Sequence, residues 1–407
     1  MSLAAVQFEI EHHFLADGKT RLTLRAGTEN PYIDTVSILS ARARKSFVHA
    51  VLERFPQLET DQVQERVEAI ASEYADWAAK QPTGKPTERA AYTPPDGKAL
   101  LAGMDQVARE QADKILRSPT LLQDLMADID RMGVVGERKL AATIYLVGVS
   151  RLLDEPLAAI IQGPSSTGKS FVVEKICRLF PGEAVIRATS LTPQCLYYLP
   201  DGSLAHRWVI AGERSRREDD EQAEATRALR EMISAGEISK MLPEKNRDGQ
   251  IESRIIHQSG PIAFSETTTL SRIFGEDLNR CILLHANETE EQTRAILRAA
   301  GADAKADAQP TIRRHWAIQR LLDPLPVEIP FGPELVEKFP CAKTEARRAF
   351  GHLLALIRAC ALLHQFQRSR NAHGAIVAEP ADYTLARSLL AEPMAQQLLL
   401  QRHKSSS

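Results

Sequence analysis

The chain has 407 residues, a formal net charge of −2 and five cysteines scattered without a Cys-x-x-Cys pair. This length leaves room for two or three domains with cores of their own, and the ordinary composition excludes a fibrous or wholly disordered protein. The nearly neutral charge excludes global attraction to nucleic acid, so any such contact requires a local basic patch. The cysteine spacing argues against a zinc module and against a disulfide framework.

Targeting and membrane signals are absent from the sequence. No signal-peptide pattern opens it, and its apolar runs are shorter than the roughly 20 residues that a membrane-spanning helix needs. We therefore expect a cytoplasmic protein with no membrane partner.

Residues 1–80 predict a small α+β module. Alternating apolar residues from 6 to 25, on both sides of Asp17-Gly18, indicate a β-hairpin, and a helical pattern follows from about Ser40 to Lys80. Residues 81–98 are rich in Pro, Thr and charge and lack an apolar period, which is typical of a linker. Residues 99–153 carry the apolar spacing of helices that lead into the next strand.

A phosphate-binding loop follows the apolar run at 157–161. Gly163 and Gly168 permit a tight backbone whose N–H groups point at phosphates, and the helical pattern after the loop adds the positive end of a helix dipole. We expect Lys169 to reach the β- and γ-phosphates of ATP, and the Ser170 hydroxyl to ligate Mg²⁺. The residues of this loop are Gly163, Pro164, Ser165, Ser166, Thr167, Gly168, Lys169 and Ser170.

Strand and helix patterns alternate on both sides of this loop over residues 154–310. This alternation predicts an α/β core with a largely parallel sheet, covered on both faces, and a nucleotide at the carboxyl ends of the strands. Residues 311–407 are predicted to be almost wholly helical, which is typical of a nucleotide-sensing lid. The strands after the loop are expected at 184–186, 208–211, 262–264 and 281–284.

Glu213 is the candidate for polarising the attacking water, because it directly follows the apolar strand that ends near Ala211. The Asp that usually precedes such a Glu is absent, since Gly212 occupies that position. We therefore expect Mg²⁺ to rely on Ser170, phosphates and water. The alternative is that Glu213 only caps a strand.

A second hairpin is predicted between the Glu213 strand and the next core strand. Residues 238–243 and 251–258 flank a turn-rich basic segment, and 221–235 before them indicate a helix that ends at Gly236. Cations on this hairpin would grip a phosphate backbone without reading sequence, whereas the alternative is a solvated surface hairpin. The cations concerned are Lys240, Lys245 and Arg247.

Thr267 and Thr268 follow the strand at 262–264, where they would contact the γ-phosphate or the attacking water. Arg280 precedes the last core strand, and an arginine there commonly reaches the nucleotide of a neighbouring subunit. The structural alternative is that Arg280 pairs with Glu276 or Asp277.

Together these motifs resemble those of the AAA+ ATPases of the pre-sensor hairpin group. The chain looks similar to the ATPase half of bacterial and mobile-element DNA primases with a zinc finger and a Toprim domain, akin to minichromosome-maintenance helicases. The similarity extends over most of the chain, from Asp34-Thr-Val-Ser-Ile-Leu-Ser through Gly133-Val-Val-Gly-Glu to Leu363-His-Gln-Phe-Gln-Arg. Its central segments are Gly-Pro-Ser-Ser-Thr-Gly-Lys-Ser, Val-Ile-Ala-Gly-Glu-Arg-Ser, Gly-Pro-Ile-Ala-Phe-Ser-Glu-Thr-Thr and Leu-Asn-Arg-Cys-Ile-Leu-Leu.

The resemblance implies an AAA+ core with an inserted β-hairpin and a helical lid. It implies that Glu213 is the catalytic acid, Thr267 or Thr268 the first sensor and Arg280 the arginine finger. The second sensor is then Arg348, with the adjacent Arg347 as the alternative. Zinc-finger cysteines and a Toprim acidic cluster are not visible in the sequence, so primer synthesis by this chain is not expected.

Two functions follow as hypotheses. The first is an ATP-dependent helicase or translocase that works as a homo-oligomeric, hexameric ring on single-stranded or forked DNA during replication of a chromosome or mobile element. A separate primase chain is a candidate partner. The second is an AAA+ switch that loads or remodels a protein partner without moving on DNA.

Overall fold

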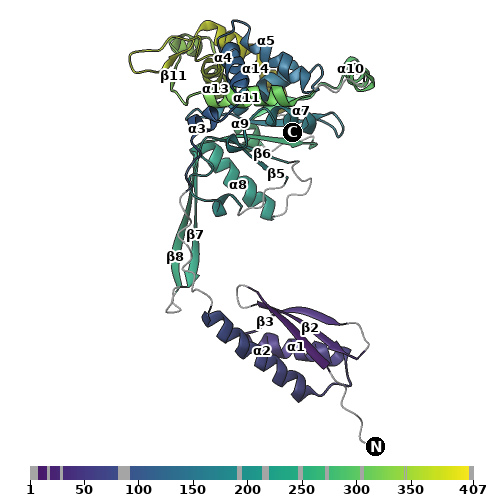
Figure 1. The fold of residues 1–407 in the computed structure, drawn as a ribbon. Coiled ribbons are helices and arrows are strands. Elements are labelled where there is room, and N and C mark those ends of the chain that lie inside the picture. The colour runs from purple at the N-terminus through teal and green to yellow at the C-terminus, as the bar shows by residue number, and fades with distance from the viewer. Residues whose placement is uncertain are drawn as a thin grey trace, which may run out of the picture. The chain divides into compact units, whose positions relative to one another are not determined.

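The chain divides into two compact units, Met1–Arg89 and Ala90–Ser407 (Figure 1). None of the helices in the described ranges is long and apolar enough to cross a membrane. The structure is a computed structural model, and it describes residues 8–15, 19–27, 31–80, 92–189, 195–212, 220–245, 251–270, 275–302, 307–342, 344 and 346–402.

The first unit is a three-stranded antiparallel sheet with two helices. The expected hairpin is confirmed, because Phe8 pairs with Ala26 at one end and Phe14 with Thr20 at the other, although its turn lies outside the described residues. The strand that pairs with the free edge of this hairpin was not predicted from the sequence. The elements are β1 (Phe8–Phe14), β2 (Lys19–Ala26), β3 (Tyr32–Ser37), α1 (Ala41–Arg54) and α2 (Thr60–Lys80).

The second unit opens with four helices, as the apolar spacing predicts. The last of them is buried along its whole length from Leu140 to Ser150, because it lies between the sheet and the C-terminal helices. The first begins at Gly97, so it overlaps the end of the predicted linker. These helices are α3 (Gly97–Ala102), α4 (Gln106–Leu116), α5 (Leu121–Arg131) and α6 (Arg138–Ser150).

A five-stranded parallel sheet forms the centre of this unit and confirms the expected α/β core. Its strand order is β10-β4-β9-β6-β5. The strand before the loop at Gly163 therefore lies between β10 and β9, and the central strand β9 separates it from the strand that leads to Glu213. The strands are β4 (Ala158–Gln162), β5 (Val185–Ala188), β6 (Arg207–Ala211), β9 (Ile262–Thr268) and β10 (Ile282–His285).

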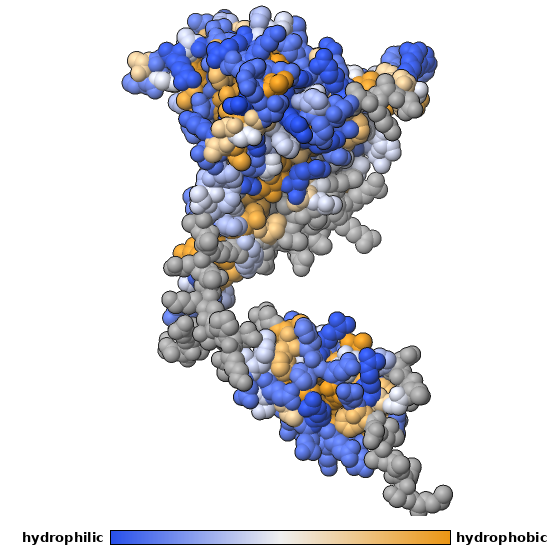
Figure 2. Space-filling model, in the orientation of Figure 1, coloured by the Kyte–Doolittle hydropathy of each residue, from blue (hydrophilic) through white to orange (hydrophobic). Residues whose placement is uncertain are grey.

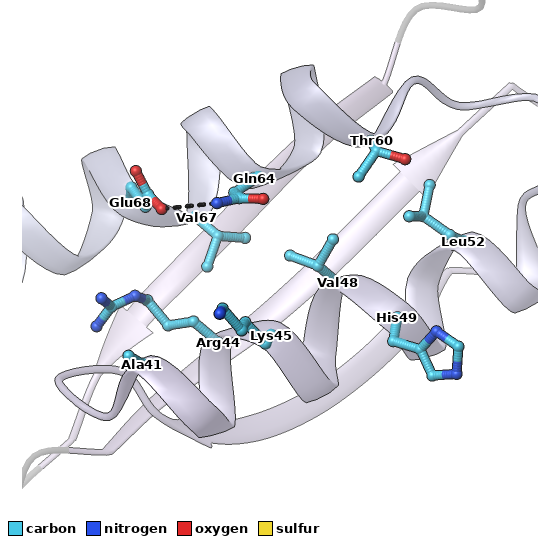
Figure 3. A pocket seen from close by; sticks show the side chains of 10 residues that line it. All are labelled: Ala41, Arg44, Lys45, Val48, His49, Leu52, Thr60, Gln64, Val67 and Glu68. Carbon is cyan, nitrogen blue, oxygen red and sulfur yellow. Dashed lines mark hydrogen bonds between the residues drawn. The ribbon is translucent and has the colours of Figure 1, made fainter.

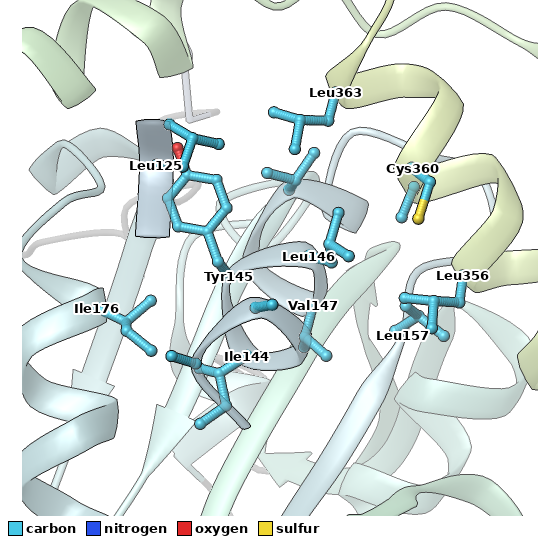
Figure 4. Close-up of a cluster of buried hydrophobic side chains, with 14 of the residues drawn as sticks. Leu125, Ile144, Tyr145, Leu146, Val147, Leu157, Ile176, Leu356, Cys360 and Leu363 are labelled. Carbon is cyan, nitrogen blue, oxygen red and sulfur yellow. The ribbon is translucent and has the colours of Figure 1, made fainter. Parts of the chain in front are cut away.

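Both faces of the sheet are buried, which explains why its strands have continuous apolar runs in place of alternation. On one face Ala159 and Ile161 pack in a cluster with α6 and with α7 (Lys169–Cys177). Figure 4 shows Ile144 of α6 and Ile176 of α7 in this cluster. On the other face Ile160 and Phe264 pack against α8 (Asp220–Ala235).

The C-terminal segment is mostly helical and shares a core with the sheet. Leu356, Cys360 and Leu363 belong to the same buried cluster as α6 (Figure 4). A two-stranded parallel pair interrupts the expected helices. The elements of this segment are α10 (Glu290–Gly301), α11 (Gln309–Leu321), β11 (Val327–Glu328), α12 (Gly332–Lys338), α13 (Ala346–Leu363), β12 (Ile376–Val377) and α14 (Pro380–Arg402), and the short helix α9 (Gly275–Arg280) lies before it, between β9 and β10.

A buried polar network joins α5, α6 and α11. His315 Nε2 donates to Asp128 Oδ2 at 3.1 Å, and Tyr145 Oη lies 3.2 Å from His315 Nδ1 and accepts from Gln319 Nε2 at 3.1 Å. Burial by itself raises the pKa of Asp128, but hydrogen bonds from His315 and Arg314 hold it well below its usual range. These three helices are thus held together by an ionised, hydrogen-bonded carboxylate as well as by apolar packing.

Candidate nucleotide-binding site

The loop between β4 and α7 has the tight backbone that its glycines predict. Ser166 and Gly168 have φ values of 70° and 83°, in the left-handed region. Gly168 is the N-cap of α7, so this helix starts directly at Lys169. A Cβ on Gly163 would lie 3.2 Å from Thr167 Oγ1. The backbone N–H groups of the first turn of α7 are therefore next to the loop, as an anion-binding site requires.

Lys169 is 5% exposed and folds back over the loop. Its Nζ donates to Gly163 O at 2.7 Å, to Pro164 O at 2.5 Å and to Thr167 Oγ1 at 3.3 Å. The acceptors are all oxygens of the loop itself. Phosphate oxygens in the loop would offer the same ammonium stronger, charged acceptors.

The structure separates the two candidate sensor threonines. The Thr267 hydroxyl lies 3.5 Å from Ser170 Oγ, because β9 is paired with β4 and Thr267 is in register with Ile161. The hydroxyl of Thr268 accepts from Leu270 N at 3.1 Å, and its carbonyl accepts from Gly163 N at 3.2 Å. Thr267 therefore faces the predicted metal ligand, whereas Thr268 holds the neighbouring backbone.

The backbone around position 212 explains why glycine occupies it, which the sequence alone did not reveal. Its N–H donates to Ala188 O at 2.8 Å, and a Cβ at this position would lie 2.1 Å from Thr189 O. An aspartate at 212 would collide with the backbone after β5. Glu213 itself lies outside the described residues, so its predicted role stays a prediction.

One buried carboxylate at the same edge of the sheet was not singled out from the sequence. Glu266 is 5% exposed and pairs in register with Ala211, the last residue of β6. It therefore lies on the strand between the phosphate-loop strand and the strand that leads to Glu213. The signal for it was present in the sequence, as an acid among the polar residues that follow Phe264.

A loop before α6 lies against one side of the site, and the sequence assigned it no chemical role. A Cβ on Gly133 would lie 3.9 Å from Phe171 Cζ in the first turn of α7. Gln292 Nε2 donates to Val135 O at 2.6 Å, and Asn287 N donates to Glu137 Oε1 at 2.8 Å. Burial raises the pKa of Glu137 and outweighs the effect of this hydrogen bond. The loop thus lies beside α7 and is hydrogen-bonded to the segment after β10.

The predicted hairpin consists of β7 (Glu237–Lys245) and β8 (Ile251–Ser259), and it projects from the second unit (Figure 1). Lys240 Nζ lies 5.6 Å from the centre of the Tyr197 ring near the base. The side chain of Lys245 and all of Arg247 lie outside the described residues. Met241 and Ile255 face each other across the strands and are 64% and 62% exposed. Figure 2 shows apolar surface along the hairpin.

Arg280 ends α9 and is bound to α8 of its own chain. Its Nε donates to Ser234 Oγ at 2.8 Å. Asp277, one of its alternative partners, holds a two-bond ion pair with Arg230 at 2.6 and 3.1 Å. The carbonyl of Arg280 lies 3.3 Å from His352 Nε2 of α13. Arg280 is therefore positioned by α8 and α13 together.

Arg347 and Arg348 both lie exposed in the first turn of α13. Arg348 is one turn before His352, whose pKa is lowered to about 4 mainly by burial, with a further contribution from the charge of Arg348. The assignment of Arg348 as the second sensor, with Arg347 as the alternative, stays a prediction.

The donor set fits a magnesium–nucleotide complex better than a metal held by protein alone. In the described ranges, no group of three His, Cys, Asp or Glu side chains is arranged to hold a metal ion. Ser170 offers one hydroxyl beside the loop, and Mg²⁺ habitually takes its remaining ligands from phosphates and water. No family model and no curated protein matches the chain.

Proposed function

We propose that the chain is an ATP-driven DNA helicase or translocase of the AAA+ type, acting as a homo-oligomeric ring in the cytoplasm. The observation that carries this proposal is the edge of the sheet where Lys169, Ser170 and Thr267 meet. The chain that leaves the neighbouring strand β6 then forms α8 and the projecting hairpin before it returns as β9. The projecting hairpin is thus connected through β6 on one side and β9 on the other to the sheet that carries the proposed nucleotide site.

The described residues support distinct roles in ATP hydrolysis. Lys169 would exchange the loop carbonyls for phosphate oxygens, and Ser170 would hold Mg²⁺. Thr267 would orient the attacking water, which Glu213 would polarise. When bound, the magnesium–nucleotide complex supplies the phosphoanhydride bond that is hydrolysed.

Arg280 would complete the site of a neighbouring subunit. It lies at the end of α9, and its guanidinium contacts Ser234 of the same chain. This hydrogen bond from a charged donor is worth about 1.5–3 kcal/mol, and charge-assisted bonds from the same guanidinium to a transferring phosphoryl group would replace it. Hydrolysis would then depend on assembly, and the single-stranded or forked DNA would lie where the hairpins converge. A separate primase chain would supply primers for such a motor.

Displacement of a labelled strand from a forked duplex tests this proposal. The wild-type chain is expected to displace the strand with ATP, and Lys169→Ala to displace none. The pair Lys245→Ala with Arg247→Ala is expected to lose displacement and to keep basal ATP hydrolysis. If that pair unwinds DNA at the wild-type rate, the hairpin does not grip the strand and the translocase proposal fails.

A second function is favoured by the chemistry of the hairpin strands. Their cations Lys240, Lys245 and Arg254 are balanced by Glu237, Glu244 and Glu252. The exposed Met241, Ile251 and Ile255 offer apolar surface. Such a ribbon suits a protein partner, as expected of an AAA+ switch that loads or remodels another protein. In that case ATP hydrolysis is stimulated by the partner and not by DNA.

A further inference from the structure

The first unit has a cleft between its two helices, on the side of α1 and α2 shown in Figure 3. The cleft has a volume of about 280 Å³. Val48 and Val67 form its apolar floor, while Arg44 and Lys45 lie on the α1 wall (Figure 3). Gln64 and Glu68 lie on the α2 wall, where Gln64 Nε2 donates to Glu68 Oε1 at 3.0 Å. The two walls therefore differ in charge.

The cations of the α1 wall have no carboxylate partner within ion-pair distance in the described part of the chain, and neither has Arg42, which lines the adjoining surface of α1 together with Lys45. Arg42, Arg44 and Lys45 take part in none of the ion pairs of this unit, which involve other residues. Arg44 is fixed by a hydrogen bond from its guanidinium to Ile38 O at 2.8 Å. The ion pairs of the unit are His12–Glu73, Arg25–Glu11, His49–Glu53 and Arg66–Glu73.

These cations oppose the stability of the helix that bears them. They lie in the first turns of α1, which has no acidic residue in its first turn, so they face the positive end of the helix dipole. This placement is unfavourable, most of all for Arg42 and Arg44 in the first turn. The core of the unit does not use them, because α1 buries Phe47, Val48 and Val51. A ligand with negative charge would reverse this cost.

We propose that this cleft binds the sugar-phosphate backbone of a single nucleic acid strand through Arg44 and Lys45, and that the strand continues over the adjoining surface of α1 to Arg42. The choice of nucleic acid as the ligand rests on the DNA motor proposed above. Guanidinium groups bind phosphate through two parallel hydrogen bonds, and the ammonium group adds a point charge. Such contacts hold a strand without reading its sequence.

The size of the cleft favours a strand over an acidic amphipathic helix. A helical partner requires apolar anchors at i, i+3, i+4 and i+7 along a groove. This cleft has a short apolar floor, and its volume lies just below the usual range for small-molecule sites. It therefore has room for a phosphodiester unit on the α1 wall.

Fluorescence anisotropy of a labelled single-stranded oligonucleotide tests the inference with the full chain and no added nucleotide. The variant Arg42→Ala with Lys45→Ala removes two exposed cations and leaves the Arg44 hydrogen bond intact. At low salt its affinity for the strand should be lower than that of wild type by up to about tenfold. The slope of log affinity against log salt concentration should become shallower by about 1.4, which is 0.7 for each lost phosphate contact. Arg44→Ala removes the third proposed phosphate contact and should likewise lower the affinity and its dependence on salt.

A matched control is Lys19→Ala with Arg21→Ala, which removes two exposed cations from β2 of the same unit. The control should keep wild-type affinity. Wild-type binding by the cleft variant, an equal loss in the control, or no binding by the wild-type chain overturns the inference. Displacement of the labelled strand by polyglutamate as readily as by the same strand without label also overturns the inference, because the cleft then binds an acidic polypeptide.

DNA-stimulated ATPase activity, measured on the same proteins, separates this inference from the motor proposal. If the strand binds through the cleft and ATP hydrolysis is not stimulated, the motor proposal fails and the inference stands. If hydrolysis is stimulated and the cleft variant binds normally, the inference fails and the motor stands.

Discussion

Replacement of Gly212 by alanine should destabilise the parallel sheet at the end of β6. The N–H of Gly212 donates to Ala188 O at 2.8 Å, so the chain runs close beside β5 at this point. A Cβ on Gly212 would lie 2.1 Å from the carbonyl oxygen of Thr189 and 2.9 Å from its carbonyl carbon. Because both atoms belong to the backbone, relief of the contact requires β5 or β6 to move.

The cost follows from the kind of atom that must move. Extra atoms in a well-packed region cost about 1–3 kcal/mol, and a backbone collision places Gly212→Ala near the upper end. A loss of about 3 kcal/mol should lower the melting temperature of a unit this large by about 4–5 °C. An aspartate at 212 would meet the same collision, which accounts for the missing Asp before Glu213.

Differential scanning calorimetry of the full chain measures this effect in the transition of the second unit. Gly182→Ala is the matched control, because a Cβ at Gly182 meets no atom within 4 Å. The control should melt within about 1 °C of wild type. If Gly212→Ala melts with the control, Gly212 is not required by the backbone and the reasoning is wrong.

Three further predictions concern the same unit. Thr267→Val should slow single-turnover ATP hydrolysis about a hundredfold. Thr268→Val loses the acceptor of Leu270 N and should lower the free energy of unfolding by about 1 kcal/mol, with little change in the hydrolysis rate. Equal rate losses in the two variants would refute the assignment of Thr267 to the reaction. Arg280→Ala should bind ATP without turnover, and mixing with Lys169→Ala subunits should restore hydrolysis if the arginine acts in trans; absence of rescue counts against it. His352 has a pKa of about 4, below its ordinary 6.5, so the unfolded chain takes up this proton first and stability falls as pH drops below 6.5. Between pH 7 and pH 5 the free energy of unfolding, measured in urea, should fall by about 2 kcal/mol more for wild type than for His352→Gln. Equal falls in the two proteins would contradict this pKa.

Local patterns predicted the elements better than their long-range contacts. The apolar run before Gly163 and the alternation around Asp17-Gly18 depend on neighbours in the chain. The strand of the first pattern and both strands of the second are present. The unpredicted strand β3 has four exposed positions, so it shows little apolar alternation.

The finer features of the site depend on residues far apart in the sequence. The collision that requires Gly212 involves Thr189 of another strand connection. The choice between Thr267 and Thr268 depends on which hydroxyl faces α7, and this follows from the register of β9 on β4. Local periodicity contains no information on either contact.

The steady-state ATPase rate with and without single-stranded DNA, at two salt concentrations, tests the central claim most directly. The wild-type chain should hydrolyse ATP faster with DNA, and higher salt should reduce this stimulation because phosphate contacts weaken with salt. Lys169→Ala should show neither activity nor stimulation. A wild-type rate equal to that of Lys169→Ala, with and without DNA, would contradict the account.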